Sequence, residues 1–175
     1  MRNDGIDFEL DVLHWMRRQL GDGRYEHRQL QRGQVADRPY EVDIHAAIPK
    51  RFWPAVICLG FIVAGILAAF TPSEVGMILS PVVIIAAVII SSVIANSPTH
   101  VWAEAKDRGA TIKRTDVLKL ANAAADVRAC GSANWHPDEL WFVSRNGFDL
   151  DALNFAREHQ VKCFVAGKRG FKRVD

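Results

Sequence analysis

One stretch of the sequence is almost free of charge, and it limits what the chain can fold into. From Phe52 to Pro98, 47 residues, the only charged residue is Glu74, whereas the other 128 residues contain the remaining 41 charged residues. This contrast excludes a soluble globule of uniform composition, a disordered chain and a secreted disulfide scaffold. The chain instead joins a very apolar insert to polar sequence of about the length of one small domain.

Within this stretch, two uncharged runs have the length of membrane-spanning helices. Trp53–Phe70 and Val75–Ala95 contain 18 and 21 residues. At about 1.5 Å per residue they would form helices of roughly 27 and 31 Å. The link between them, residues 71–74, is too short for anything but a tight reversal. The sequence therefore predicts a transmembrane helical hairpin over 52–98, and the alternative interpretation is a helical pair buried in a soluble core.

Basic residues flank the outer ends of the predicted hairpin, and none lies at its tip. Lys50 and Arg51 precede the first run, and Lys106 and Arg108 follow the second. Because positively charged flanks stay on the cytoplasmic side, this pattern predicts an inner-membrane protein with both termini and the polar domain in the cytoplasm. The lipid bilayer is then an expected partner.

The polar sequence on either side of the insert shows helical and strand patterns in turn. Residues 1–51 and 99–175 are expected to form two parts of one domain, interrupted by the insert at 52–98. Helices are predicted over 5–20, 115–129 and 149–159, strands over 24–31, 40–46, 100–107, 139–143 and 161–165, and a basic tail over 168–173. This order predicts an α/β fold with a mixed sheet.

Two of the predicted strands carry charged residues that can meet on one face of the sheet. Asp43 lies on the first strand, on the face opposite Val42 and Ile44, while Glu104 and Lys106 share a face of the second. Without the insert, the two acidic residues would be 14 positions apart. That is hairpin distance, so the strands can be antiparallel neighbours. Two carboxylates and an ammonium group would then converge.

This combination of side chains suits metal-assisted hydrolysis of phosphodiesters. Carboxylate oxygens are the ligands that Mg²⁺ and Mn²⁺ prefer, and a nearby cation relieves the repulsion between two carboxylates. A lysine beside the metal can position a water molecule or offset charge on a phosphate. The E-x-K triplet is also frequent by chance, so an ordinary solvated strand face is the alternative interpretation.

Five segments occur in an order that is typical of a nuclease family. They are Phe8-Glu9 in the first helix, Tyr40–Ile44, Val101–Lys106, Glu139–Phe148 and Val161–Val165. In this order they resemble the PD-(D/E)xK restriction-endonuclease-like superfamily and, within it, the Mrr-type nucleases. The sequence departs from the family pattern in three ways. Val42, not proline, precedes Asp43; Glu104 stands where the Mrr type often has glutamine; and an insert separates the two catalytic strands.

The resemblance implies a fold, an activity and a set of site residues. It implies a mixed sheet flanked by helices and a divalent-metal-dependent DNA endonuclease, for which defence against foreign DNA is a natural use. By the resemblance, Asp43, Glu104 and the Ala105 carbonyl would hold Mg²⁺ or Mn²⁺. Lys106 would orient or activate the attacking water, and Glu9 would assist from the first helix. An exposed acidic residue in a first helical turn is the alternative interpretation of Glu9.

A second class of function stays open beside the membrane-anchored nuclease. A nuclease-like fold can serve as a non-catalytic module that binds nucleic acid or partner proteins, with the hairpin as an assembly element. The intact Asp43, Glu104 and Lys106 favour the enzyme, whereas the net charge of only +3 outside the insert is a mild argument for the module. Besides DNA, a second copy of the chain or a companion protein is an expected partner.

Overall fold

A computed structural model describes residues 4–36, 38–49, 53–70, 81–90, 98–131, 133–168 and 170–175. The chain divides into two compact units. The first combines Met1–Ile48 with Thr99–Asp175, and the second is Pro49–Pro98. The two stretches of polar sequence therefore form one unit, and the apolar insert belongs to the other.

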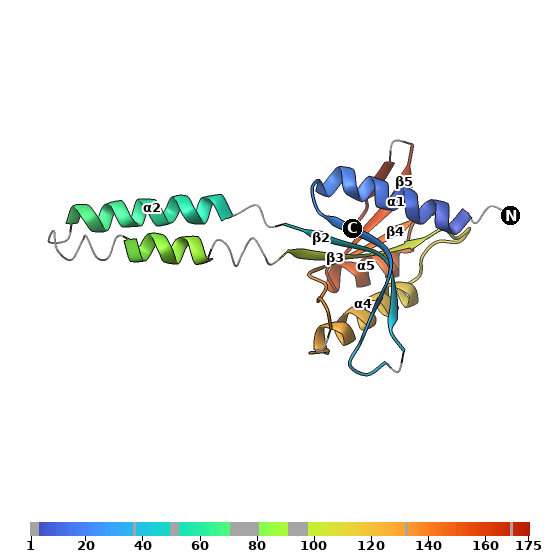
Figure 1. Cartoon of the computed structure of the whole chain (residues 1–175). Helices are drawn as coiled ribbons and strands as arrows, with labels where there is room; N and C mark the ends of the chain where they lie inside the picture. Colours follow the sequence, from blue (N-terminus) through green and yellow to red (C-terminus); the bar gives the residue numbers. More distant parts are fainter. Residues whose placement is uncertain are drawn as a thin grey trace. The chain divides into compact units, whose positions relative to one another are not determined.

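Within the described residues, a six-stranded mixed sheet forms the framework of the first unit (Figure 1). Its strands lie side by side in chain order: β1 (Arg24–Gln31), β2 (Tyr40–Ile48), β3 (Thr99–Lys106), β4 (Glu139–Ser144), β5 (Val161–Gly167) and β6 (Gly170–Arg173). The pairs β1–β2, β2–β3 and β5–β6 are antiparallel, and β3–β4 and β4–β5 are parallel. The first unit is therefore α/β with a mixed sheet, as the order of sequence patterns predicts.

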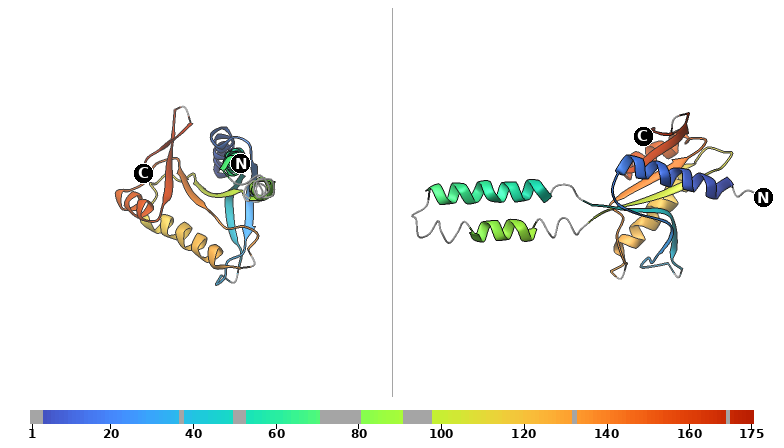
Figure 2. Two further views of the ribbon diagram at one scale, coloured as in Figure 1. Left: turned by 90° about the vertical axis from the view of Figure 1, so that its left-hand side faces the viewer. Right: turned by 45° about the horizontal axis from the view of Figure 1, so that its top comes forward.

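Helices cover both faces of this sheet (Figures 1 and 2). The helix α1 (Asp4–Leu20) packs on one face, and α4 (Arg114–Ala129) and α5 (Leu150–Glu158) pack on the other. α4 connects β3 to β4, and α5 connects β4 to β5. Each of these helices connects two parallel strands. Such a connection must be long enough to bring the chain back to the end of the sheet at which the first strand began.

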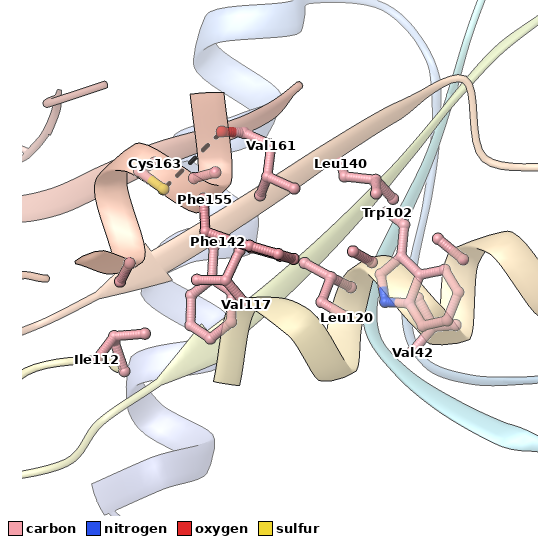
Figure 3. Close-up of a cluster of buried hydrophobic side chains, with 14 of the residues drawn as sticks. Val42, Trp102, Ile112, Val117, Leu120, Leu140, Phe142, Phe155, Val161 and Cys163 are labelled. Carbon is pink, nitrogen blue, oxygen red and sulfur yellow. Dashed lines mark hydrogen bonds between the residues drawn. The ribbon is translucent and has the colours of Figure 1, made fainter. Parts of the chain in front are cut away.

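An apolar cluster on each face holds these layers together. The cluster under α4 and α5 includes Trp102, Phe142 and Phe155 (Figure 3). In the cluster under α1, the ring of Trp15 lies 4.9 Å from that of Phe164, in an edge-on arrangement. Burial of such large side chains is the main stabilising contribution to the domain.

The strand β2 changes its packing at Asp43. Val42 belongs to the cluster under α4 and α5, whereas Ile44 belongs to the cluster under α1. The prediction that Val42 and Ile44 share one face is therefore wrong. The pairing of β1 with β2 passes over Arg28 and Asp43, and Arg28 has a positive φ of 55°. A positive φ is uncommon for a residue other than glycine. It interrupts the regular pairing of β1 with β2 at the point where the alternation of side chains along β2 is also broken.

The second unit contains the apolar insert. Its described helical segments are α2 (Trp53–Phe70) and residues 81–90, which approach each other at the buried Gly60 and Ala87. Across the described part of the chain, no helix is both long and apolar enough to cross a membrane, so the predicted transmembrane hairpin over 52–98 is wrong.

Parts of that prediction cannot be compared with the structure. The link at 71–74 and much of the second run, residues 75–80 and 91–95, lie outside the described residues. The inner-membrane location and the bilayer as a partner stay untested predictions.

The basic segment at the end of the chain forms part of the sheet, so the prediction of a tail over 168–173 is wrong. Residues Gly170–Arg173 form β6, which pairs antiparallel with β5. Phe171 is the apolar residue of this strand and packs against the cluster under α1. Lysine and arginine are common on edge strands because their charges oppose pairing with other chains. With only one apolar residue, this edge strand has no alternation that the sequence could reveal.

Asp126, on α4, stabilises the loop that precedes β2 through hydrogen bonds. Its carboxylate accepts hydrogen bonds from the backbone N–H groups of Gln34, Val35 and Ala36 and from the hydroxyl of Tyr40, at 2.8–3.2 Å. Gly33 permits this close approach, since a Cβ at that position would lie 2.0 Å from Asp126 Oδ2. Desolvation alone would raise the pKa of Asp126, but these hydrogen bonds outweigh it and hold the pKa below its ordinary value.

Asp126→Asn should therefore reduce the loss of folding stability that occurs when the pH is lowered into the acid range. Since the pKa of the folded protein is lowered, the carboxylate's contribution is complete above the ordinary aspartate value of 3.8 and is lost as the pH falls through the lowered pKa. The variant should melt at a lower temperature than the wild type at neutral pH, and the difference should shrink in acid. Thermal unfolding across this pH range measures the effect, with the exposed Asp22→Asn as control. Parallel pH profiles for Asp126→Asn and the wild type would contradict the assignment.

Candidate functional site

The structure brings Asp43, Glu104 and Lys106 together at the junction of β2 and β3. The ammonium nitrogen of Lys106 lies 3.8 Å from Asp43 Oδ2 and contacts Glu104 Oε1 directly. The side chains keep 12%, 19% and 27% of their surface exposed, respectively. The cluster is therefore largely desolvated but still open to a molecule from solution.

The backbone geometry explains how Asp43 reaches the neighbouring strand. The pairing of β2 with β3 extends to Ile44 and Ala103 and stops there. Asp43 Oδ2 then accepts the backbone N–H of Ala105 at 2.9 Å, in place of a backbone carbonyl. Because the N–H and C=O of a strand residue point to the same edge, the Ala105 carbonyl also points toward the β2 side of β3.

Burial raises the pKa values of the two carboxyl groups, and neighbouring carboxylates add to the rise. The pKa of Glu104 is raised to about 7, first by burial and then by the charge of Asp43, with Lys106 opposing both. The pKa of Asp43 is also raised by burial, although Lys106 and the Ala105 N–H lower it. Burial alone would lower the pKa of Lys106, but Glu104 and Asp43 outweigh it and hold the pKa above its ordinary value. The lysine is therefore a permanent ammonium, and the carboxylates would be stabilised by a further cation.

Glu9 is buried in α1 and held by two residues of β1. His27 Nε2 lies 2.7 Å from Glu9 Oε2, and Arg28 donates to both carboxylate oxygens at 2.9 and 3.0 Å. Burial alone would raise the pKa of Glu9, but Arg28 and His27 lower it overall. The interpretation of Glu9 as an exposed acid is therefore wrong. Glu9 forms hydrogen bonds and ion pairs with His27 and Arg28, yet its charge contributes to the raised pKa values of Asp43 and Glu104.

Sequence spacing does not indicate the partners of Glu9, because tertiary packing brings α1 against β1. Arg28 reaches Glu9 from the one position of β1 with a positive φ, next to the point where the β1–β2 pairing is interrupted. A strained conformation of this kind persists only where surrounding contacts hold it. The bidentate bond to Glu9 is such a contact.

A pocket of about 460 Å³ opens beside the cluster. Glu104 and Lys106 lie on one side of it, and α4 contributes Lys119 and Asn122 on another. Trp102 supplies part of its apolar lining. The cluster therefore borders a cavity of the size that small ligands occupy in proteins.

The oxygen atoms of the cluster fit a divalent cation that keeps several water ligands. In the described ranges, no group of three histidine, cysteine, aspartate or glutamate side chains is arranged to hold a metal. Asp43, Glu104 and the Ala105 carbonyl nevertheless supply oxygen donors, and a bound cation would offset the burial that raises the pKa of both carboxyl groups. Mg²⁺ is commonly bound through one or two carboxylates with water completing its shell.

Comparison with known proteins identifies a shared fold. No protein-family model matches the sequence, and no curated protein is detectably similar to it. The structure is similar to the crystal structure of AF1548, a protein of unknown function, with a TM-score of 0.53 and 10% sequence identity. The match covers 94% of this chain and 61% of that chain, so this chain spans less than two thirds of AF1548. At this identity the similarity concerns the fold alone.

Proposed function

We propose that this protein is a divalent-metal-dependent nuclease that hydrolyses phosphodiester bonds in DNA. The observation that carries the proposal is the contact of the Lys106 ammonium with both carboxylates, Asp43 and Glu104. The order of segments that resembles the PD-(D/E)xK superfamily and its Mrr-type members supports the same activity.

Each residue of the cluster has a role that its surroundings support. Asp43, Glu104 and the Ala105 carbonyl would hold Mg²⁺ or Mn²⁺, which when bound supplies a Lewis acid for the phosphate and a more acidic water. Asp43 is oriented for this by the Ala105 N–H. Lys106 keeps its proton and orients the attacking water or a phosphate oxygen through its ammonium group.

Glu9 and Arg28 act at the edge of this cluster rather than on the reacting atoms. The negative charge of Glu9 is largely offset by the guanidinium of Arg28. Arg28 is partly exposed and also lies 3.7 Å from Glu41. Arg28 therefore reduces the repulsion between Glu9 and the carboxylates of Asp43 and Glu104, so that a third carboxylate can lie near the site.

Metal-dependent cleavage by the purified full chain tests the proposal. We expect the wild type to cut DNA in Mg²⁺ or Mn²⁺ but not in excess EDTA, and Asp43→Asn to abolish cleavage in either metal. The control is Asp151→Asn, which removes an exposed carboxylate on α5. Equal cleavage by Asp43→Asn and the wild type would contradict the proposal. DNA binding without cleavage in any divalent metal would instead support the non-catalytic module.

A further inference from the structure

We infer that the pocket beside the cluster takes one unpaired nucleotide, so that the substrate is single-stranded or locally unpaired nucleic acid. This inference rests on the nuclease proposed above and specifies its substrate. It follows from the size of the pocket, an unpaired donor in its wall and the balance of its charges.

The dimensions of the pocket select against an intact duplex. Its volume of about 460 Å³ lies between β3 and α4, directly beside Glu104 and Lys106. A cavity of this size can enclose a single nucleotide. A base that is stacked and paired in a duplex cannot enter such a cavity unless it is first extruded, and extrusion is easiest where the strand is already unpaired.

The lining of the pocket suits a base. Tyr40 contributes a partly exposed aromatic ring, with the buried ring of Trp102 behind it at 6.4 Å between centroids, and Asn122 contributes an exposed amide from α4. Aromatic side chains bind unpaired bases by stacking, whatever the base. An amide group can both donate to and accept from a base edge.

Trp102 also leaves a hydrogen-bond donor unused in the wall. Its indole N–H is buried and has no hydrogen-bond partner among the residues that the structure describes. The side chain is 2% exposed and lines the pocket (Figure 3 shows its ring in the cluster under α4). Buried donors are nearly always paired, and an acceptor on a ligand or on a water that reaches this wall of the pocket would pair this one.

The charges around the pocket make its affinity for phosphate depend on a metal ion. Three acidic and three basic side chains line it: Glu41, Glu104, Asp116, Lys106, Arg108 and Lys119. Lys106 contacts Glu104, and Arg108 lies 3.4 Å from Asp116. Lys119 is exposed and makes no ion pair with any residue of the described ranges. It is therefore the cation available for a phosphate, and a divalent ion at the cluster would supply the positive charge that the balanced lining lacks.

Binding measured without cleavage tests the inference. A fluorescent DNA strand and the same strand within a duplex are titrated with the full chain in Ca²⁺, and anisotropy reports binding. We expect the single strand to bind about tenfold more tightly than the duplex, and to bind much more weakly in EDTA. Lys119→Ala should weaken binding of the single strand several-fold and reduce the slope of log affinity against log salt by about 0.7, the value of one phosphate contact. Lys172→Ala, an exposed lysine on β6, is the matched control and should change neither.

The outcomes separate this inference from the proposed activity. Equal binding of strand and duplex, or equal effects of Lys119→Ala and Lys172→Ala, would overturn the pocket assignment even if the protein cleaves DNA in Mg²⁺. Tight, Lys119-dependent binding of the strand without cleavage would overturn the nuclease and leave the pocket assignment intact. A free mononucleotide is added as competitor, and binding of it more tightly than of the strand would overturn the assignment to a nucleic-acid strand.

Discussion

Replacing Lys106 by methionine should lower the rate of phosphodiester cleavage by about 10²- to 10⁴-fold, the range found when a group that handles the reacting water is removed. Methionine keeps most of the length of the lysine stem but lacks the ammonium that contacts Asp43 and Glu104. Because that ammonium competes for the same two carboxylates, the variant should bind Mn²⁺ at least as tightly as the wild type. Single-turnover cleavage and calorimetric titration with Mn²⁺ measure the two effects separately.

A second lysine of the same sheet offers a matched control for this variant. Lys162 on β5 lies 2.7 Å from Glu139 and has a side chain 32% exposed, close to the 27% of Lys106. Lys162→Met should therefore reproduce any general effect of losing a lysine–carboxylate pair without affecting cleavage. If Lys106→Met lost metal binding together with activity, the lysine would be supporting the structure of the site rather than its chemistry.

Phe142→Ala should destabilise the domain by about 3 to 5 kcal/mol, the usual cost of deleting a fully buried aromatic side chain. Phe142 lies in the middle of β4 and is 1% exposed, within the cluster that Figure 3 shows. Its ring packs edge-on against that of Phe148, with centroids 5.7 Å apart. Both its neighbouring strands are parallel partners, so the cavity cannot collapse without disturbing the centre of the sheet. The melting temperature should fall by about 6 to 20 °C.

Thermal unfolding followed by circular dichroism measures this loss in the full chain. The control is Val35→Ala, which shortens a side chain that is 83% exposed and should change stability by no more than about 0.5 kcal/mol. A change as small as that of the control would show that the cluster under α4 and α5 does not hold the domain together.

The sequence was sufficient to predict most of the sheet and the three helices that pack on it, α1, α4 and α5. The predicted strands over 24–31 and 139–143 correspond to β1 and β4, and the predicted helix over 115–129 to α4. These elements were predictable because each has a strand-like or helical pattern, which in 139–143 is a short apolar run, and lies near residues that favour turns or caps. Asp43, Glu104 and Lys106 could be placed together for the same reason, since strand alternation and hairpin distance are both local properties.

Other features depend on contacts between elements, which spacing along the chain does not report. The positive φ of Arg28 and its bond to Glu9 arise where α1 meets β1, and there β2 transfers from one apolar cluster to the other. The alternation of side chains along β2 therefore predicted wrongly that Val42 and Ile44 share a face of the sheet. The pocket likewise exists because α4 crosses back beside β3 and brings Lys119 near Glu104.

The apolar insert shows the same division. Composition alone determined that residues 52–98 differ from the rest of the chain, because a near absence of charge is a property of the sequence itself. Where each apolar run forms helix is decided by backbone hydrogen bonds, and no helix among the described residues is long and apolar enough for the predicted crossing. For the site, the sequence determined which groups carry the chemistry. The tertiary structure decided their pKa values, their partners and the cavity beside them, because burial and charge proximity arise only when distant segments pack together.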